Sequence, residues 1–164
     1  MTSQDSFFEK ITAAQITRVS VRSLCFRGEC VLVQRPSDDD TANFAFPGGR
    51  LEYGESLSER VRAEYQEEMG VSIEPPQFLF VVENRFWHRD KIYHGVEHYF
   101  LVQPPLTSIV SQEPHIVFHW LPLAELADAD LRPTVVRDSI CDGSWRTARL
   151  LSVPFNETHS PRSV

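Results

Sequence analysis

Glutamates crowd into one short segment of this 164-residue sequence. Six lie between residues 52 and 68, and Glu64, Glu67 and Glu68 are spaced three and four positions apart. A helix would place these three carboxylates on one face, where like charges cost about 0.2–0.5 kcal/mol per pair. Clustered carboxylate oxygens are also the ligands that Mg²⁺ prefers. Two interpretations follow: a divalent-metal site, or an acidic helix face that water solvates.

A glycine turn, Pro47-Gly48-Gly49, leads toward these glutamates. Glycine lets the backbone approach a ligand closely, so a carbonyl oxygen of the turn could serve the same site. The helix that would carry the glutamates has recognisable ends, since Ser56 and Glu59 form a capping-box pattern and Gly70 suits the position after the last turn. Its apolar residues repeat every four positions, as Leu57, Val61 and Tyr65. We expect a helix over residues 57–69.

Residues 49–71 resemble the Nudix box, whose pattern is G-x5-E-x7-R-E-U-x-E-E-x-G-U, with U a bulky apolar residue. Tyr65 is an acceptable U, and Phe46-Pro47-Gly48 looks like the usual entry to the box. The matching fixed positions are Gly49, Glu55, Glu64, Glu67, Glu68, Gly70 and Val71. A pattern with so many fixed positions is highly specific, and the flanking segments are compatible with it.

The resemblance implies an α/β/α sandwich around a mixed β-sheet. It also implies hydrolysis of a nucleoside diphosphate linked to another group X, with water attacking a phosphorus and Mg²⁺ or Mn²⁺ as cofactor. By the same resemblance, Glu64 and Glu68 correspond to the principal metal ligands. Glu67 corresponds to an auxiliary ligand that is sometimes the general base, and the carbonyl of Gly48 to a backbone ligand. The positions that would be structural are Gly49, Glu55 and Gly70.

The box departs from the family pattern at one position. The family's arginine before the first helix glutamate, which helps to orient carboxylates by ion pairing, is Ala63 here. Arg60 lies three residues earlier on the same helix face, and we expect it to substitute for the missing arginine.

The general base of some family members lies outside the box. Two candidates occur here: Glu97, on a strand over 96–102, and Glu113, in the loop 111–115. The alternatives for a strand glutamate are a paired or a solvent-facing side chain.

Residues 85–94 combine cations with aromatic rings, which suit phosphate and nucleobase binding. The candidate substrate-binding residues are Arg50, Arg85 and Trp87. The simpler interpretation of 85–94 is an exposed hairpin whose rings cover the edge of the core. The histidines have no zinc-ligand spacing.

The elements that must position these residues can be read along the chain. We expect one domain over 1–164, with strands and helices alternating irregularly around a mixed sheet with helices on both faces. The expected segments are a helix 3–13, a hairpin 15–34, strands 44–46, 77–84, 95–103 and 116–121, a helical turn 123–127, a helix 133–141, and a frayed tail from 156.

Composition and charge limit the kinds of molecule that this protein is expected to bind. The formal charge of −7 argues against binding nucleic-acid polymers. The partner that the resemblance implies is a small nucleotide. No segment is long and apolar enough to span a membrane, and residues 1–10 do not resemble a secretory signal. Three scattered cysteines suggest reduced thiols and a cytoplasmic location. Phe7 and Phe8 of the first helix could pack on their own domain or on a second subunit, so a homodimer is possible.

Two rival functions remain open at this point. A Nudix-fold module with weak or no catalysis could bind a nucleotide or regulate a partner, and Ala63 keeps this alternative alive. An isomerase on the same fold would act on an allylic diphosphate, but nothing outside the box supports it specifically. The retained glutamates favour the hydrolase, because a pure sensor has no need of costly clustered charge.

Overall fold

The computed structural model describes residues 3–155, so the tail predicted to fray from 156 lies outside the described residues. The helices are α1 (Ser3–Ala13), α2 (Leu57–Met69) and α3 (Thr134–Asp142), with short 3-10 turns η1 (Leu123–Glu125) and η2 (Ser144–Arg146). The strands are β1 (Arg18–Arg27), β2 (Cys30–Pro36), β3 (Phe44–Ala45), β4 (Gln77–His88), β5 (Lys91–Val102), β6 (Ile116–Pro122), β7 (Leu131–Arg132) and β8 (Leu150–Ser152). Within the described chain no helix is long and apolar enough to cross a bilayer.

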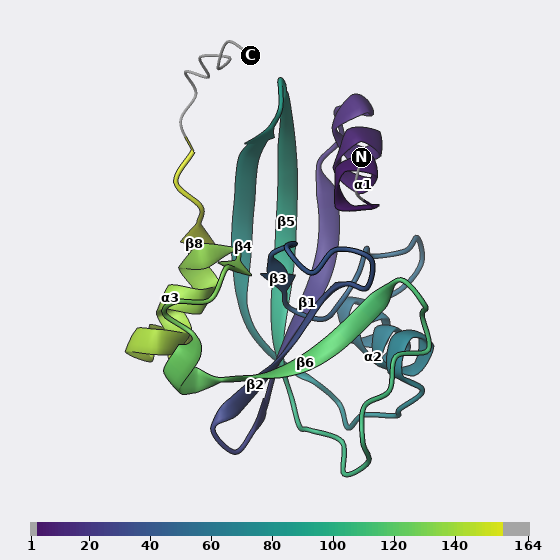
Figure 1. Cartoon of the computed structure of the whole chain (residues 1–164), viewed down its shortest axis with the longest axis vertical. Coiled ribbons are helices and arrows are strands. Elements are labelled where there is room, and N and C mark those ends of the chain that lie inside the picture. The colour runs from purple at the N-terminus through teal and green to yellow at the C-terminus, as the bar shows by residue number, and fades with distance from the viewer. Residues whose placement is uncertain (1–2, 156–164) are drawn as a thin grey trace.

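The strands form one mixed, strongly curled sheet (Figure 1). Its order is β7-β3-β2-β1-β5-β4-β8, and β6 pairs with β2 off this path. Strand β1 runs parallel to β5 along its length but pairs with β2 only at its last residues, Phe26 and Arg27. The β2–β6 pair therefore turns away from β4 and β5, and leaves a concave side between the two parts of the sheet.

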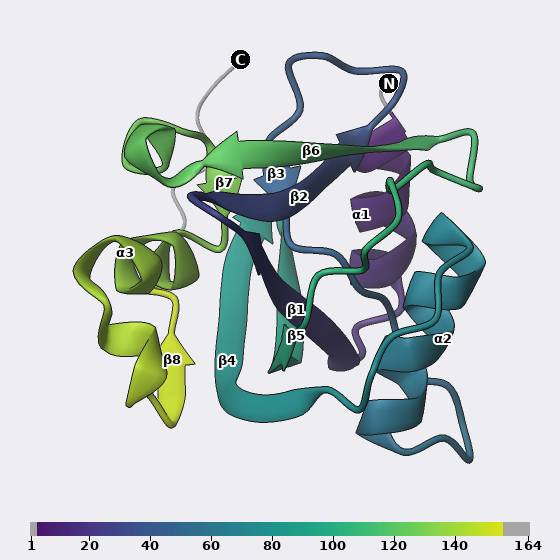
Figure 2. The same cartoon turned by 90° about the horizontal axis from the view of Figure 1, so that it is seen from below.

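Two apolar clusters cover opposite faces of the sheet, and each is closed by a helix (Figure 2). Helix α2 contributes Val61, Tyr65 and Met69 to one cluster, which includes Val21 and Cys25 of β1. The other cluster contains Val136 of α3 and Trp145 of η2, together with Leu24, Phe80 and Tyr99 from the strands. The expected fold class, a Nudix-type α/β/α sandwich around a mixed sheet, is confirmed.

The ends of α2 follow from its capping residues. The amide of Glu59 donates to Ser56 Oγ at 3.2 Å, and the Ser56 amide donates to Glu59 Oε2 at 2.8 Å. Gly70 has φ +67° and its amide donates to Gln66 O at 3.0 Å. The prediction of a capped helix over 57–69 is confirmed. Because both ends are fixed, the rotation of the glutamate face about the helix axis is fixed as well.

The prediction that residues 85–94 separate two strands is wrong. These residues extend β4 and β5 into one long hairpin that closes at Arg89 and Asp90. Arg89 adopts φ +56°. Hairpin turns with positive φ usually contain a pair such as Asn-Gly, and the sequence has no such pair here. The hairpin alternative is the one observed. The short strands β7 and β8 were not expected, and the turn at 123–127 is shorter than predicted.

Helix α1 occupies 3–13 as predicted and packs on its own chain, against β5 and β4. Figure 1 shows it beside the upper part of that hairpin. The first turn of the chain and the tip of β4–β5 are therefore neighbours, although about eighty residues separate them.

Candidate active site

The glutamate face of α2 meets the loop that follows β3. Glu64 is buried, with 8% of its surface exposed, and Glu68 is partly buried beside it. Oxygen Oε2 of Glu68 is buried and has no hydrogen-bond partner among the described residues. The side chain of Glu67 is 59% exposed. The structure thus brings Glu64 and Glu68 to the inner side of the helix and leaves Glu67 at its rim.

Glycines allow the loop to touch both the helix and β1. A Cβ added to Gly49 would lie 1.9 Å from Glu64 Oε1, so any side chain there would displace the carboxylate. Gly48 has φ +140°, and a Cβ there would lie 2.2 Å from the carbonyl oxygen of Val21. Backbone bonds hold the loop to β1, since Val21 N donates to Gly49 O at 2.9 Å. The carbonyl of Gly48 accepts a hydrogen bond from Arg22 Nη1 at 3.0 Å, and Gly48 lines the same cavity as Glu64 and Glu68.

Arg60 sits at the centre of the box carboxylates. Its guanidinium lies 3.0 Å from Glu64, 2.5 Å from Glu67 and 3.5 Å from Glu55, and its side chain is almost fully buried. Burial disfavours its charge, but the hydrogen bond to Glu67 and the neighbouring carboxylates raise the pKa of Arg60. Arg60 therefore makes the kind of carboxylate contacts that the resemblance assigns to the arginine absent at position 63.

The two inner carboxylates are held in a state that resists ionisation. Burial raises the pKa of Glu64, with Arg60 opposing the rise and Glu67 adding to it. Burial and the charge of Glu64 raise the pKa of Glu68 to about 8, and Glu113 adds to the rise. Crowded, desolvated carboxylates release their protons readily only when a cation joins them.

These residues fit a divalent cation. The fit rests on the unpartnered Glu68 oxygen, the mutual repulsion of Glu64 and Glu68, and the fixed carbonyl of Gly48, which together supply the hard oxygen ligands that Mg²⁺ and Mn²⁺ take. Across residues 3–155, no three His, Cys, Asp or Glu side chains are already gathered closely enough to hold a metal. Glu67 would have to leave Arg60 to join the other two.

The two candidate bases lie on different sides of the site. Glu97 is buried and accepts hydrogen bonds from Asn84 Nδ2 at 3.0 Å and from the Tyr99 hydroxyl at 3.1 Å. Burial disfavours the charge of Arg22, but Glu97 and nearby tyrosines raise its pKa. Glu113 lies on the loop beside the end of α2, where the amide of Gln112 donates to Glu68 O at 2.7 Å. The charge of Glu113 acts on Glu68, whereas that of Glu97 acts on Arg22.

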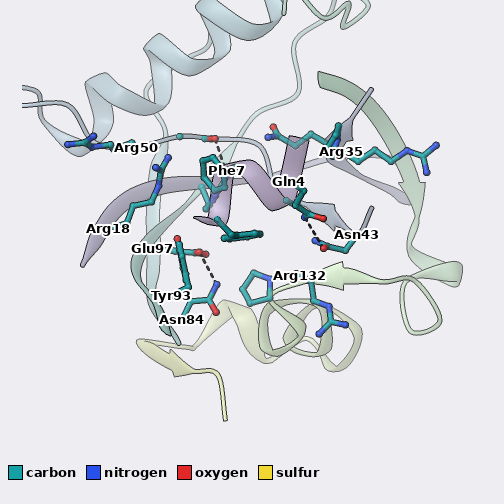
Figure 3. Close-up of a pocket in the computed structure, with 18 of the residues that line it drawn as sticks. Gln4, Phe7, Arg18, Arg35, Asn43, Arg50, Asn84, Tyr93, Glu97 and Arg132 are labelled. Atoms are coloured by element: carbon teal, nitrogen blue, oxygen red, sulfur yellow. Dashed lines mark hydrogen bonds between the residues drawn. The ribbon is translucent and has the colours of Figure 1, made fainter. Parts of the chain in front are cut away.

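Glu64 and Glu68 line a cavity of about 740 Å³. Figure 3 shows the same cavity with Arg18, Arg50 and Glu97 among its labelled lining residues. Of the described residues, five arginines and three glutamates line it: Arg18, Arg22, Arg35, Arg50 and Arg132, with Glu64, Glu68 and Glu97. Arg35 and Arg132 are engaged by Asp40 and Asp130 respectively. The cavity is thus rich in cations inside a chain whose formal charge is −7.

The predicted substrate-binding residues divide between the cavity and the outside. Arg50 and Trp87 line the cavity, whereas Arg85 is not among its lining residues and lies over the ring of Phe155. Sequence reasoning missed Arg18 and Arg22, which face inward from the mainly apolar β1. Arg18 and Arg22 are four positions apart, so a strand places both on the same face. This spacing could have identified them as a pair. Sequence reasoning also missed Phe7 and Asn84, whereas Tyr93 belongs to the segment 85–94 that it considered for nucleobase binding.

Comparison with known proteins gives a consistent result. The NUDIX domain family model matches residues 16–139. A mutator MutT protein from Bacillus halodurans superposes with a TM-score of 0.65 at 20% identity, covering 82% of this chain and 86% of that one. An ADP-ribose pyrophosphatase from Streptococcus suis gives 0.60 at 15% identity, covering 81% and 98%. A UDP-X diphosphatase gives 0.58 at 17% identity, covering 92% and 76%. At these identities the solved structures establish a shared fold.

Proposed function

This chain belongs to the NUDIX domain family of hydrolases, and we propose that it is a metal-dependent nucleotide pyrophosphatase. Its substrate would be a nucleoside diphosphate linked to another group X. The observation that carries the proposal is the buried, unpartnered carboxylate oxygen of Glu68 beside Glu64, at the floor of an arginine-lined cavity. The names of two structural neighbours, an ADP-ribose pyrophosphatase and a UDP-X diphosphatase, support this class of substrate.

The cation would be held by Glu64, Glu68 and the carbonyl of Gly48, with Glu67 as the auxiliary ligand. A bound Mg²⁺ or Mn²⁺ supplies charge neutralisation of the diphosphate and acidifies a water molecule. Arg60 keeps the carboxylates in place through its three ion pairs. Gly49 keeps the space that the Glu64 carboxylate needs.

The arginines of the cavity would bind the diphosphate. Arg18, Arg22 and Arg50 line the same cavity as Glu64 and Glu68. Burial lowers the pKa of Arg18. The charges of Arg22 and Arg50 lower this pKa further, whereas the charge of Glu64 raises it. In the described chain Arg18 has no carboxylate within ion-pair distance. A phosphate group placed here would give this desolvated guanidinium the anionic partner that it lacks.

We favour Glu113 of the two candidate bases. Glu97 lines the cavity but is already hydrogen-bonded, whereas Glu113 lies outside the cavity lining and acts on Glu68. Its carboxylate is close enough to affect Glu68 and is only partly exposed, so it can take a proton from a water molecule near the box. Glu97 is already engaged by Asn84 and Tyr99, and its charge stabilises the Arg22 guanidinium that holds Gly48 O. We therefore assign Glu97 the role of a positioning residue, while Glu67 remains a third candidate base.

The decisive experiment measures phosphate and mononucleotide release from a panel of nucleoside diphosphate derivatives in millimolar Mg²⁺. We expect turnover of one substrate class, abolished by EDTA and reduced at least a hundredfold in Glu68→Gln. Glu113→Gln should lower kcat with KM retained, whereas Glu97→Gln should shift both. Release that persists in EDTA at the same rate would contradict the proposal.

The second candidate function is a nucleotide-binding module with weak catalysis, which the absence of arginine at position 63 favours. The same panel separates the two, because a module would raise its melting temperature with nucleotide and metal without releasing product. The three cysteines are unpaired in the structure, in keeping with the cytoplasmic location that we propose. A homodimer stays a prediction.

A further inference from the structure

Helix α1 forms part of the cavity although it lies outside the matched family segment, 16–139. Its residues Gln4, Phe7 and Phe8 line the same cavity as the box glutamates. The helix therefore lies before the matched segment and contributes side chains to the cavity, where a substrate could contact it.

Several contacts fasten α1 over the cavity. Arg89, at the tip of the β4–β5 hairpin, pairs with Glu9 and lies 3.9 Å from Asp5. Phe8 packs into an aromatic cluster with ring centroids 5.2 to 5.5 Å away, formed by Phe86, His88 and Tyr93. Phe8 therefore anchors the helix, and its ring is committed to that packing.

Phe7 is not used in this way. It is 41% exposed and touches the edge of Phe8 at a centroid distance of 5.3 Å. The Arg18 guanidinium lies 5.0 Å from its centroid, and Arg18 Nε is buried without a hydrogen-bond partner among the described residues. A large exposed ring thus stands next to a cation whose charge is also coupled to Glu64 and Arg50.

Side-chain amide groups line the same cavity as the Phe7 ring. Gln4 Nε2 donates to Asn43 Oδ1 at 3.0 Å, which joins α1 to the loop before β3. Figure 3 shows Phe7, Arg18 and this Gln4–Asn43 pair around the same cavity. Side-chain amides offer both donors and acceptors, as the edge of a nucleobase does.

We propose that α1 supplies a nucleobase subsite, in which the base stacks on Phe7 and its edge contacts the amides of Gln4 and Asn43. Arg18 would hold the adjoining phosphate, which joins this subsite to the reaction site. The proposal thereby assigns recognition of the base to α1 and to the loop before β3. The inference rests on the proposed function only for the place of the phosphate, since the stacking surface and the amides are independent of catalysis.

The test measures equilibrium binding, so it needs no turnover. Isothermal titration in millimolar Mg²⁺ compares AMP, GMP, CMP and UMP with ribose 5-phosphate, on wild type, Phe7→Ala and Phe7→Tyr. At least one nucleoside monophosphate should bind about tenfold more tightly than ribose 5-phosphate, in line with base–aromatic stacking. Phe7→Ala should remove this difference without weakening ribose 5-phosphate, and Phe7→Tyr should keep it.

Phe78→Ala is the matched control, because Phe78 is 49% exposed and lies outside the cavity. It should leave the preference intact, whereas Arg89→Ala, which frees α1 from the hairpin tip, should weaken it. Equal affinities for ribose 5-phosphate and all four nucleotides in wild type, or a preference unchanged in Phe7→Ala, would overturn the inference. A Phe7-dependent preference without hydrolysis of any panel substrate would instead reject the proposed function and keep the subsite.

Discussion

At the scale of single residues, the arrangement around Arg60 matters most. One buried guanidinium is shared among Glu55, Glu64 and Glu67, and it comes from one turn before the position where the family pattern places its arginine. A helix allows this exchange because residues three apart lie on the same face. Arg60 thus makes, from within α2, the carboxylate contacts that we expect of the arginine missing at position 63.

Replacing Arg60 tests this account. Arg60→Ala should lower Mg²⁺ affinity and kcat by about 10- to 100-fold, the range seen when groups that orient metal ligands are removed. Arg60→Lys should have values of Mg²⁺ affinity and kcat between those of wild type and Arg60→Ala, because an ammonium group cannot reproduce the forked hydrogen bonds of a guanidinium. Activity measured over a range of Mg²⁺ concentrations gives kcat, and the melting temperature over the same range gives the Mg²⁺ affinity. If Ala63→Arg in the Arg60→Ala background restores metal affinity, the two positions are equivalent; unchanged values in Arg60→Ala itself would rule the role out.

At the scale of elements, the site depends on how closely the loop 46–50 approaches α2. Backbone bonds fix the loop to β1, and the capping box fixes the start of the helix. The only space left between them at Gly49 is filled by the carboxylate of Glu64. The loop and the helix thus set the position of Glu64, which we propose as a metal ligand.

Gly49→Ala should push the Glu64 carboxylate away from the loop. Overpacking of this kind costs about 1–3 kcal/mol of folding free energy, and Mg²⁺ affinity should fall more than tenfold. Denaturant unfolding and metal titration provide the measurements. In a Glu64→Ala background the same substitution should cost much less stability, since the clashing carboxylate is gone. Equal costs in both backgrounds would show that the backbone, and not Glu64, resists the alanine.

At the scale of the whole molecule, charge is distributed unevenly. The chain carries −7 overall, yet arginines line its cavity. An acidic exterior with a cationic cavity suits a small phosphorylated ligand better than a nucleic-acid polymer, which needs an extended basic face. The raised pKa of Glu68 also makes the stability of the whole molecule depend on pH.

Folding stability without metal should fall as the pH rises from about 4.5 to about 8. The folded Glu68 carboxyl keeps its proton up to about pH 8, whereas the unfolded chain releases it near pH 4.5. In this window the folded state binds more protons, so each further unit of pH favours unfolding, at about 1.4 kcal/mol per unit for a full proton. Urea unfolding of wild type and Glu68→Gln across pH 5–8 measures the difference. The variant should lose this slope, and Mg²⁺ should stabilise wild type more at pH 8 than at pH 6. Parallel curves for the two proteins would contradict the assignment.

Much of the local structure could be predicted because its causes lie close together in the sequence. The capping box and Gly70 fix α2, and the apolar alternation around Gly28 indicates the β1–β2 hairpin. The prediction failed at residues 85–94, where polar and aromatic residues extend a hairpin past the body of the sheet. The turn residue there is Arg89 with φ +56°, so no glycine marks it.

The sequence by itself determined the family and the fold class, because the box encodes a helix, its caps and its carboxylate face within 23 residues. It also predicted the group of residues that we propose to hold a metal. Only the tertiary structure decided which other residues join that group. Strand alternation assigns Arg18 and Arg22 to one face of β1, but the curl of the sheet makes that face a cavity wall and leaves Arg85 outside. The contact of Arg89 with Glu9 spans eighty residues and brings Phe7 to the cavity. No local pattern specifies such a pairing, since it depends on where the whole chain places two distant segments.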